Sequence, residues 1–174
     1  PNSTVKKSET VLTTPIVIYS WDIVVDALEK QGVVKKNNKY YTLDMEKMLD
    51  MIDNEKKWSD IGLAELYGKI SISTTDPVKS NSGNMFAALS ANVLNGGDVV
   101  NQSTVESILP KLKNIFIKLG YMETSSGDLF EQYLRTGVGA KPLVAGYESQ
   151  IIEFAYENES SFSQIKDKVR VLYP

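Results

Sequence analysis

The run Pro15-Ile16-Val17-Ile18-Tyr19 decides how the rest of the chain is interpreted. It is short, apolar and rich in β-branched residues, which is typical of a strand buried on both faces. Residues 70–74, 141–145 and 169–173 have a similar strand pattern, and apolar residues at helical spacing separate the four runs. Strands that alternate with helices predict an α/β fold of three layers, α/β/α, around a mostly parallel central sheet.

The chain divides into a short polar segment and one domain. Residues 1–14 are rich in Ser, Thr and Lys and are interpreted as a linker or hinge segment. Residues 15–174 are interpreted as a single α/β domain. With 174 residues, of which 42% are hydrophobic, such a domain can bury a core without disulfides or a structural metal.

Composition narrows the chemistry. The chain has no cysteine and no histidine, so it lacks a thiolate nucleophile, the commonest general base at neutral pH and the commonest transition-metal ligand. A carboxylate-based site or a Ser–Lys pair remains open, but Lys79 and Ser82 stand in the order Lys-x-x-Ser in a loop, not Ser-x-x-Lys on a helix. We therefore expect no catalytic residue, metal site or cofactor. The 19 basic and 22 acidic residues also argue against nucleic acid as a partner.

Polar and aromatic side chains follow three of the predicted strands. In parallel α/β sheets, ligands bind beyond the carboxyl ends of the strands. This rule selects Tyr19 and Trp21 after the first strand, Ser80, Asn81, Ser82, Gly83 and Asn84 after the second, and Tyr147 and Glu148 after the third.

The segment Ser80-Asn81-Ser82-Gly83-Asn84 stands at the predicted start of a helix. Free N–H groups and the positive end of the helix dipole attract a polar or anionic group there, and glycine allows a close approach. Ser and Asn are also ordinary helix caps, so both interpretations stay open. Residues 125–128, Ser-Ser-Gly-Asp, have similar chemistry but follow a helix, and are interpreted as a plain N-cap.

The other selected residues have two interpretations each. Tyr19 and Trp21 either wall a pocket with their rings or lie in the core. Tyr147 can donate its hydroxyl to a ligand. Glu148 either binds a cation or a ligand amine, or only offsets a helix dipole.

Taken in order, residues 14–21, 70–84 and 139–148 resemble the type II periplasmic binding protein family, in the bacterial solute-binding branch akin to molybdate- and sulfate-binding proteins. The resemblance implies one lobe of that fold, the second, with ligand contacts from residues 80–84 and Tyr147, and with Tyr19 or Trp21 near the hinge. Asn81 and Asn84 depart from the small hydroxyl residues of oxyanion binders.

The same resemblance implies a function and a location. It predicts an extracellular or cell-surface module, lipid-anchored in the full-length protein, that captures a small polar or anionic solute for an ABC-type importer. Its partners would be that solute, the missing first lobe of the same protein and a membrane permease. The alternative is a surface interaction or signalling domain that keeps the fold without transport.

Overall fold

The computed structural model describes residues 9–10 and 12–174. Most of the predicted linker, residues 1–8 and 11, lies outside them. In chain order the elements are β1 (Ile16–Trp21), α1 (Asp22–Lys30), β2 (Val34–Asn37), β3 (Tyr40–Leu43), α2 (Met45–Asp53), the 3-10 helix η1 (Trp58–Ile61), α3 (Asn81–Leu94), α4 (Val105–Leu119), α5 (Ser126–Thr136), β4 (Leu143–Tyr147), α6 (Glu148–Glu157), α7 (Glu159–Ile165) and β5 (Val169–Tyr173).

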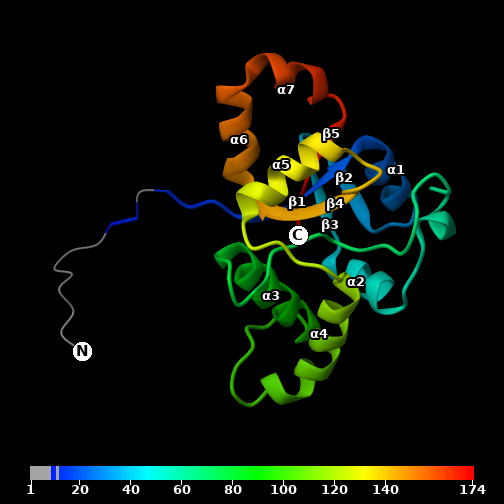
Figure 1. Cartoon of the computed structure of the whole chain (residues 1–174). Helices are drawn as coiled ribbons and strands as arrows, with labels where there is room; N and C mark the ends of the chain where they lie inside the picture. The colour runs from blue at the N-terminus through cyan, green and yellow to red at the C-terminus, as the bar shows by residue number, and fades with distance from the viewer. Residues whose placement is uncertain (1–8, 11) are drawn as a thin grey trace.

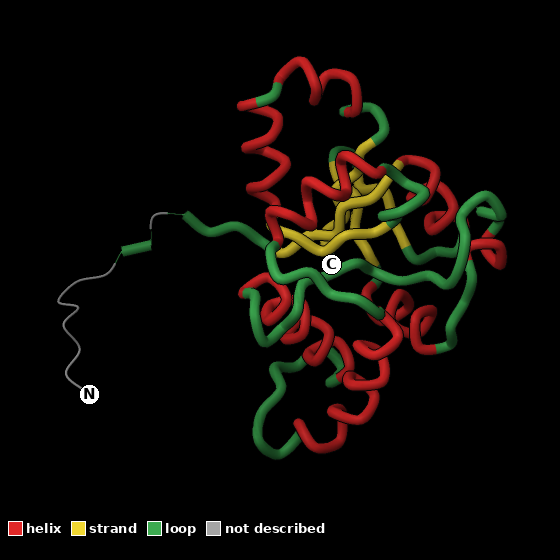
Figure 2. Tube along the Cα trace, in the orientation of Figure 1, coloured by secondary structure: helices red, strands yellow, loops and turns green. Residues whose placement is uncertain are grey.

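The sheet lies between two groups of helices (Figures 1 and 2). In the view of Figure 1, α2, α3 and α4 lie below the sheet and α5 lies above it, with α6 and α7 rising further. Helix α1 packs against β1, β2 and β5. Helices therefore cover both faces of a central sheet, and the predicted α/β class is confirmed. Among the helices that the structure describes, none is long and apolar enough to cross a membrane.

The predicted mostly parallel sheet was wrong. The strand order is β2-β3-β5-β1-β4, and β1 runs antiparallel to both of its neighbours. Strands β2 and β3 form an antiparallel hairpin, so among the described strands only β3 and β5 pair in parallel. Alternation of strands and helices does not fix direction: β4 and β5 come late in the chain and flank β1 from both sides, each running opposite to it.

Individual strands were predicted with mixed success. Those at 15–19, 141–145 and 169–173 correspond to β1, β4 and β5 within two residues. Residues 70–74 form no strand and make one isolated parallel bridge, Ser73 to Val144. The β2–β3 hairpin was missed because only its outer residues Val34 and Leu43 are buried, so the sequence shows no apolar alternation there.

The core above the sheet is aromatic. Tyr19 of β1 and Tyr133 of α5 are fully buried and stack with ring centroids 5.8 Å apart. The Tyr133 hydroxyl donates to the carbonyl of Ser20, and burial raises the pKa of this hydroxyl far above its usual range. The neutral ring and its hydrogen bond fix α5 over β1.

Candidate functional site

Most of the predicted site residues lie at one end of the sheet, the end where β1 begins and where β4 and β5 finish. Ile16 at the start of β1 pairs with Tyr147 at the end of β4, and β5 ends beside the same start. The extended residues before α3 run parallel to β4 through Ser73 and reach this end at Thr75. This end of the sheet, where the chain enters β1, therefore holds the first turn of α3 together with Tyr147 and Glu148.

The serines at the start of α3 are hydrogen-bonded inside the protein. The Ser82 side chain is buried, and its Oγ lies 2.8 Å from Thr75 Oγ1 and 3.0 Å from Ser80 Oγ. Ser80 is the N-cap residue, yet its side chain makes no capping bond. The two hydroxyls thus anchor the helix start to Thr75, and Ser82 can reach a ligand only through its backbone.

Gly83 is required by the protein's own backbone. A Cβ built on this residue would lie 2.3 Å from the Thr75 carbonyl oxygen and 2.8 Å from the Asp76 carbonyl oxygen. The missing side chain was interpreted as room for a ligand, whereas the structure shows the Thr75–Asp76 backbone in that space. Any side chain here displaces α3 from that loop.

Several donors at the same place have no partner within the described chain. The N–H groups of Asn81, Ser82 and Gly83 have no acceptor there, as expected for a first helical turn, and the next N–H, that of Asn84, donates to Ser80. The side chains of Asn81 and Asn84 are exposed and form no hydrogen bond to the described residues. Three backbone amides, two of them on the buried residues Ser82 and Gly83, and two exposed carboxamides therefore have no partner among the described residues.

The loop before α3 is held by Asp76. Its Oδ1 accepts from the Val78 N–H at 2.8 Å, and its Oδ2 lies 3.2 Å from Lys79 Nζ. The Val78 N–H, with Lys79, holds the pKa of the Asp76 carboxyl below its usual range. The ionised carboxylate shapes the turn that presents Ser80.

At the end of β4, Glu148 contacts a residue that the sequence rule did not select. Its Oε1 accepts a hydrogen bond from the hydroxyl of Tyr173. This bond, with burial, raises the pKa of Tyr173 to about 12. Tyr147 donates its N–H to Gln150 Oε1 at 2.8 Å, and its carbonyl accepts from the Tyr19 hydroxyl. Tyr173 ends the fourth predicted strand, so the carboxyl-end rule would have found it.

Tyr19 and Trp21 belong to the core. Tyr19 is fully buried, and only its hydroxyl reaches the edge, at Tyr147. Trp21 pairs with Val169 at the opposite edge, and its Nε1 donates to the Lys141 carbonyl at 3.0 Å. Because β1 is antiparallel, its carboxyl end lies away from those of β4 and β5. The structure does not bring Trp21 to the other candidates.

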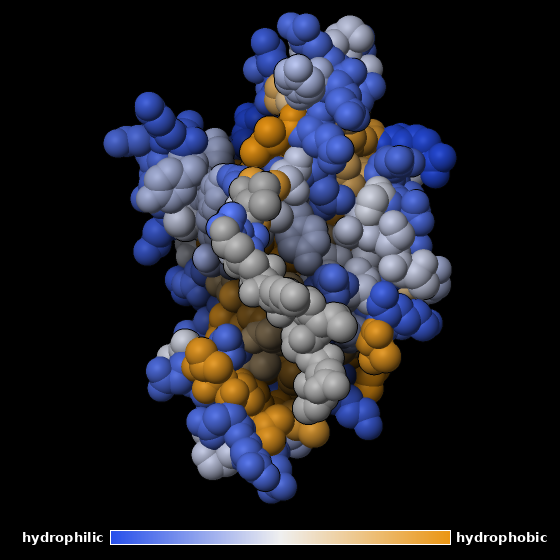
Figure 3. All heavy atoms as spheres, turned by 90° about the vertical axis from the view of Figure 1, so that its left-hand side faces the viewer, coloured by the Kyte–Doolittle hydropathy of each residue, from blue (hydrophilic) through white to orange (hydrophobic). Residues whose placement is uncertain are grey.

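A groove runs along α3, beside the polar residues at the start of this helix. It has a volume of about 290 Å³, and its lining is mostly apolar: Ile16, Met85, Ala88, Leu89, Asn92 and Pro174. Figure 3 views the molecule from this edge, and hydrophobic atoms gather in its lower half, at the height of α3 and α4 in Figure 1. Met85, on the apolar stripe of α3, is 51% exposed beside this groove.

Known proteins give no guide to the function of this site. Comparison of the chain with protein-family models, curated proteins and solved structures finds no match in any of the three. In the described residues, no group of three or more acidic side chains is placed to hold a metal ion. The functional argument therefore rests on the contacts around α3 and β4.

Proposed function

We propose that this chain is a solute-binding lobe of an extracellular binding protein, and that it holds a small polar or anionic ligand at the start of α3. The observation that carries the proposal is the set of unpartnered donors: three backbone N–H groups and the carboxamides of Asn81 and Asn84. Oriented N–H groups at the positive end of a 14-residue helix attract negative charge and hydrogen-bond acceptors.

The buried serines support this arrangement by fixing the helix start. Because the Ser82 hydroxyl bonds to both Ser80 and Thr75, the first turn of α3 is tied to the preceding loop and its backbone amides are held in place. A preorganised donor set loses little conformational entropy when a ligand binds. Glu148 and Tyr173, at the same edge, would favour a ligand with a donor at its other end, such as an amine or hydroxyl.

A second lobe is part of the proposal. In a two-lobed binding protein, the partner lobe closes over the ligand, and closure is a population shift driven by contacts to both lobes. The groove formed by Met85, Ala88 and Leu89 with Ile16 and Pro174 offers apolar area for such a lobe. Delivery to a membrane permease would follow from closure. The isolated lobe binds weakly because it supplies half of the contacts.

Nitrogen-15 NMR titration of the 174-residue chain tests the site. Inorganic sulfate, phosphate, an amino acid and a monosaccharide are added separately. We expect at least one of them to shift the amide signals of Asn81, Ser82 and Gly83 and the carboxamide signals of Asn81 and Asn84, in a saturable manner. Asn81→Ala with Asn84→Ala should weaken this response without lowering the melting temperature, because both side chains are exposed and unpartnered.

Asn158→Ala is the matched control, since this asparagine is also exposed but follows α6. It should leave the titration unchanged. If none of the four probes moves the α3 amides, or if the double variant responds as the unmodified chain does, the ligand site is not at α3.

If the titration shows no ligand at α3, the groove favours the second candidate function, binding of a protein partner. An exposed apolar face beside a well-packed helix start suits a protein partner, so a surface interaction domain without transport is the second candidate. Substituting Met85 and Leu89 with glutamate would abolish partner binding in that case and would leave small-molecule titrations unaffected.

A further inference from the structure

The β2–β3 hairpin carries three lysines, Lys35, Lys36 and Lys39, and no acidic residue, in a chain whose formal charge is −3. Sequence pairs such as Lys35-Lys36 look like scattered surface charge. The hairpin turn brings Lys39 beside them.

The two lysines at the tip are not neutralised. Lys36 and Lys39 form no ion pair within the described chain, and Lys36 Nζ lies 5.7 Å from the centre of the Tyr41 ring. Lys35 differs, because its charge acts on Asp44, the N-cap of α2. Asp44 in turn pairs with Lys47 at 3.2 Å. The free positive charge is therefore concentrated at the turn.

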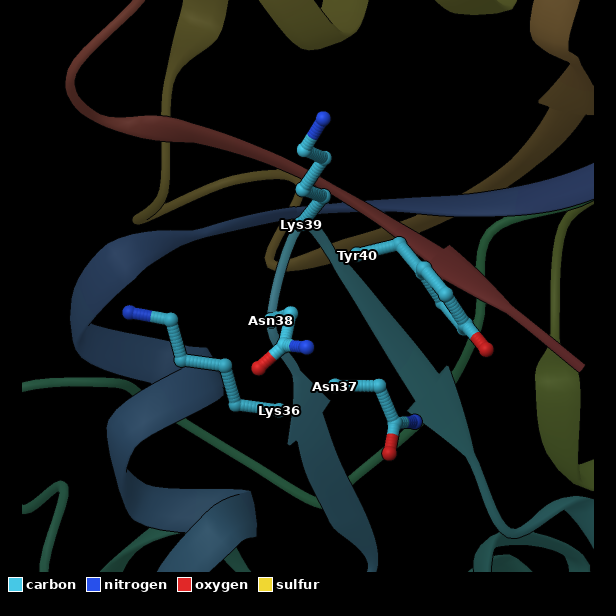
Figure 4. Close-up of a pocket in the computed structure, with 5 residues that line it drawn as sticks. All are labelled: Lys36, Asn37, Asn38, Lys39 and Tyr40. Atoms are coloured by element: carbon cyan, nitrogen blue, oxygen red, sulfur yellow. The ribbon is translucent and has the colours of Figure 1, made fainter.

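Two open hollows meet at Tyr40. One, of about 470 Å³, is lined by Lys36, Asn37, Asn38, Lys39 and Tyr40. The other, of about 380 Å³, is lined by Tyr40 and Tyr173, whose rings are perpendicular with centroids 6.0 Å apart. Figure 4 shows that Lys36 and Tyr40 extend to opposite sides of the hairpin and that Lys39 projects beyond the turn.

We infer that this hairpin binds an acidic polysaccharide. The lysines would pair with its carboxylates, the Asn37 and Asn38 amides would bond to hydroxyls, and a sugar ring would pack on the half-exposed ring of Tyr40, beside the partly buried Tyr173. Tyrosine suits this role because it offers an apolar face and a polar tip. Lysine-rich segments of this length are a recognised pattern for acidic glycans as well as nucleic acids.

Charge density favours the glycan over nucleic acid. Nucleic acid binding gains its affinity from many neutralised phosphates, spaced about 1.7 Å apart along a duplex, and loses it steeply with salt. Two free lysines on one turn of a net acidic protein neutralise few of them. An acidic polysaccharide carries its charges one or more sugar rings apart, which fits two lysines that project in different directions from the turn, with the Tyr40 ring on the opposite side of the hairpin from Lys36.

Protection of an edge strand against pairing with other chains is another reason for lysines here, but it explains fewer features of the hairpin than glycan binding does. Strand β2 is an edge strand, and edge lysines discourage pairing with other chains. That role needs charge on β2 alone. It does not account for Lys39 in the turn, or for an exposed tyrosine ring on β3 with a hollow on each side.

Calorimetric titration with oligogalacturonate fragments tests the inference, with oligo(dT) and neutral dextran oligomers as comparisons. The unmodified chain should bind the oligogalacturonate and neither comparison. Lys36→Glu with Lys39→Glu should weaken binding by about tenfold or more, since two exposed charge pairs become repulsive. Tyr40→Ala should weaken it by about fivefold while leaving its salt dependence unchanged, because stacking does not involve charge.

The matched control is Lys56→Glu with Lys113→Glu, which makes the same change in net charge away from the hairpin. These lysines are exposed and unpaired in the described structure, so this variant should bind within about twofold of the unmodified chain. The inference is overturned by any of three results: no oligogalacturonate binding by the unmodified chain, equal losses in both double variants, or tighter binding of oligo(dT). Melting temperatures equal to that of the unmodified chain exclude misfolding as the cause of a loss.

Discussion

The starts of α3 and α5 look alike in sequence and are built differently. Each has serines and one glycine within five residues, Ser80 to Asn84 and Ser125 to Asp128. At α5, Ser125 accepts from the Asp128 N–H at 3.2 Å, which is an ordinary N-cap. At α3, the hydroxyl of the N-cap residue Ser80 bonds to the hydroxyl of Ser82, and no side chain accepts a hydrogen bond from the first-turn amides.

The difference shows what each glycine is for. A Cβ added at Gly127 would have Ser125 Oγ as its nearest neighbour, at 3.6 Å, which is an ordinary contact, whereas one added at Gly83 would meet the Thr75 carbonyl oxygen at 2.3 Å. One glycine is optional and the other is required for packing. The cap of α5 satisfies one first-turn amide, that of Asp128, whereas none of the three first-turn amides of α3 has an acceptor among the described residues. A helix start locked by its side chains, with its amides left over, has donors for a ligand.

The largest expected effect comes from adding one methyl group at each glycine. Gly83→Ala should lower the free energy of unfolding by roughly 3 kcal/mol or more, because the clash is with backbone and no rotamer change relieves it. Gly127→Ala should raise it by about 0.5–1 kcal/mol, since alanine restricts the unfolded chain and fits the site. Urea unfolding followed by circular dichroism measures both. Equal effects at the two sites would mean that α3 does not pack against the Thr75–Asp76 backbone as described.

The cap serines should respond in the opposite order. Ser125→Ala removes the acceptor for Asp128 and should cost about 1 kcal/mol. Ser80→Ala should cost less than about 0.5 kcal/mol, because Ser80 caps no amide and Ser82 keeps its bond to Thr75. The same unfolding measurement applies. A larger loss at Ser80 than at Ser125 would show that Ser80 caps α3 in solution, and would remove the argument for free amides there.

Sequence alone predicted the α/β class, three of the strands and the ordinary cap of α5, because local apolar patterns and a single side-chain cap determine these features. Strand direction was not predictable, since the pairing of β1 with β4 and β5 joins residues more than 120 positions apart. The same long-range pairing put Tyr19 in the core and Trp21 at the other edge. Nothing local shows that Gly83 meets Thr75, because that contact depends on how the loop at Asp76 folds back.

The smallest expected effect concerns pH, and it separates the two helix starts by chemistry. The loop before α3 depends on an ionised carboxylate, that of Asp76, which accepts from the Val78 N–H, whereas the cap of α5 is a serine hydroxyl that does not titrate. The pKa of Asp76 lies below its usual value of 3.8 in the folded chain. Its contribution to stability is therefore complete above that usual value and is lost as the pH falls through the lower, folded pKa.

Carbon-13 NMR of the carboxyl groups measures this directly in the folded chain and in urea. We expect Asp76 to titrate at a lower pH in the folded chain, with the Val78 amide signal following the same midpoint. Lys79→Met should move the midpoint only part of the way back, because the backbone donor remains, and Lys113→Met should not move it. A folded Asp76 that titrates at or above its value in urea would mean that the turn at Val78 is open. The start of α3 would then lack the fixed geometry that distinguishes it from α5.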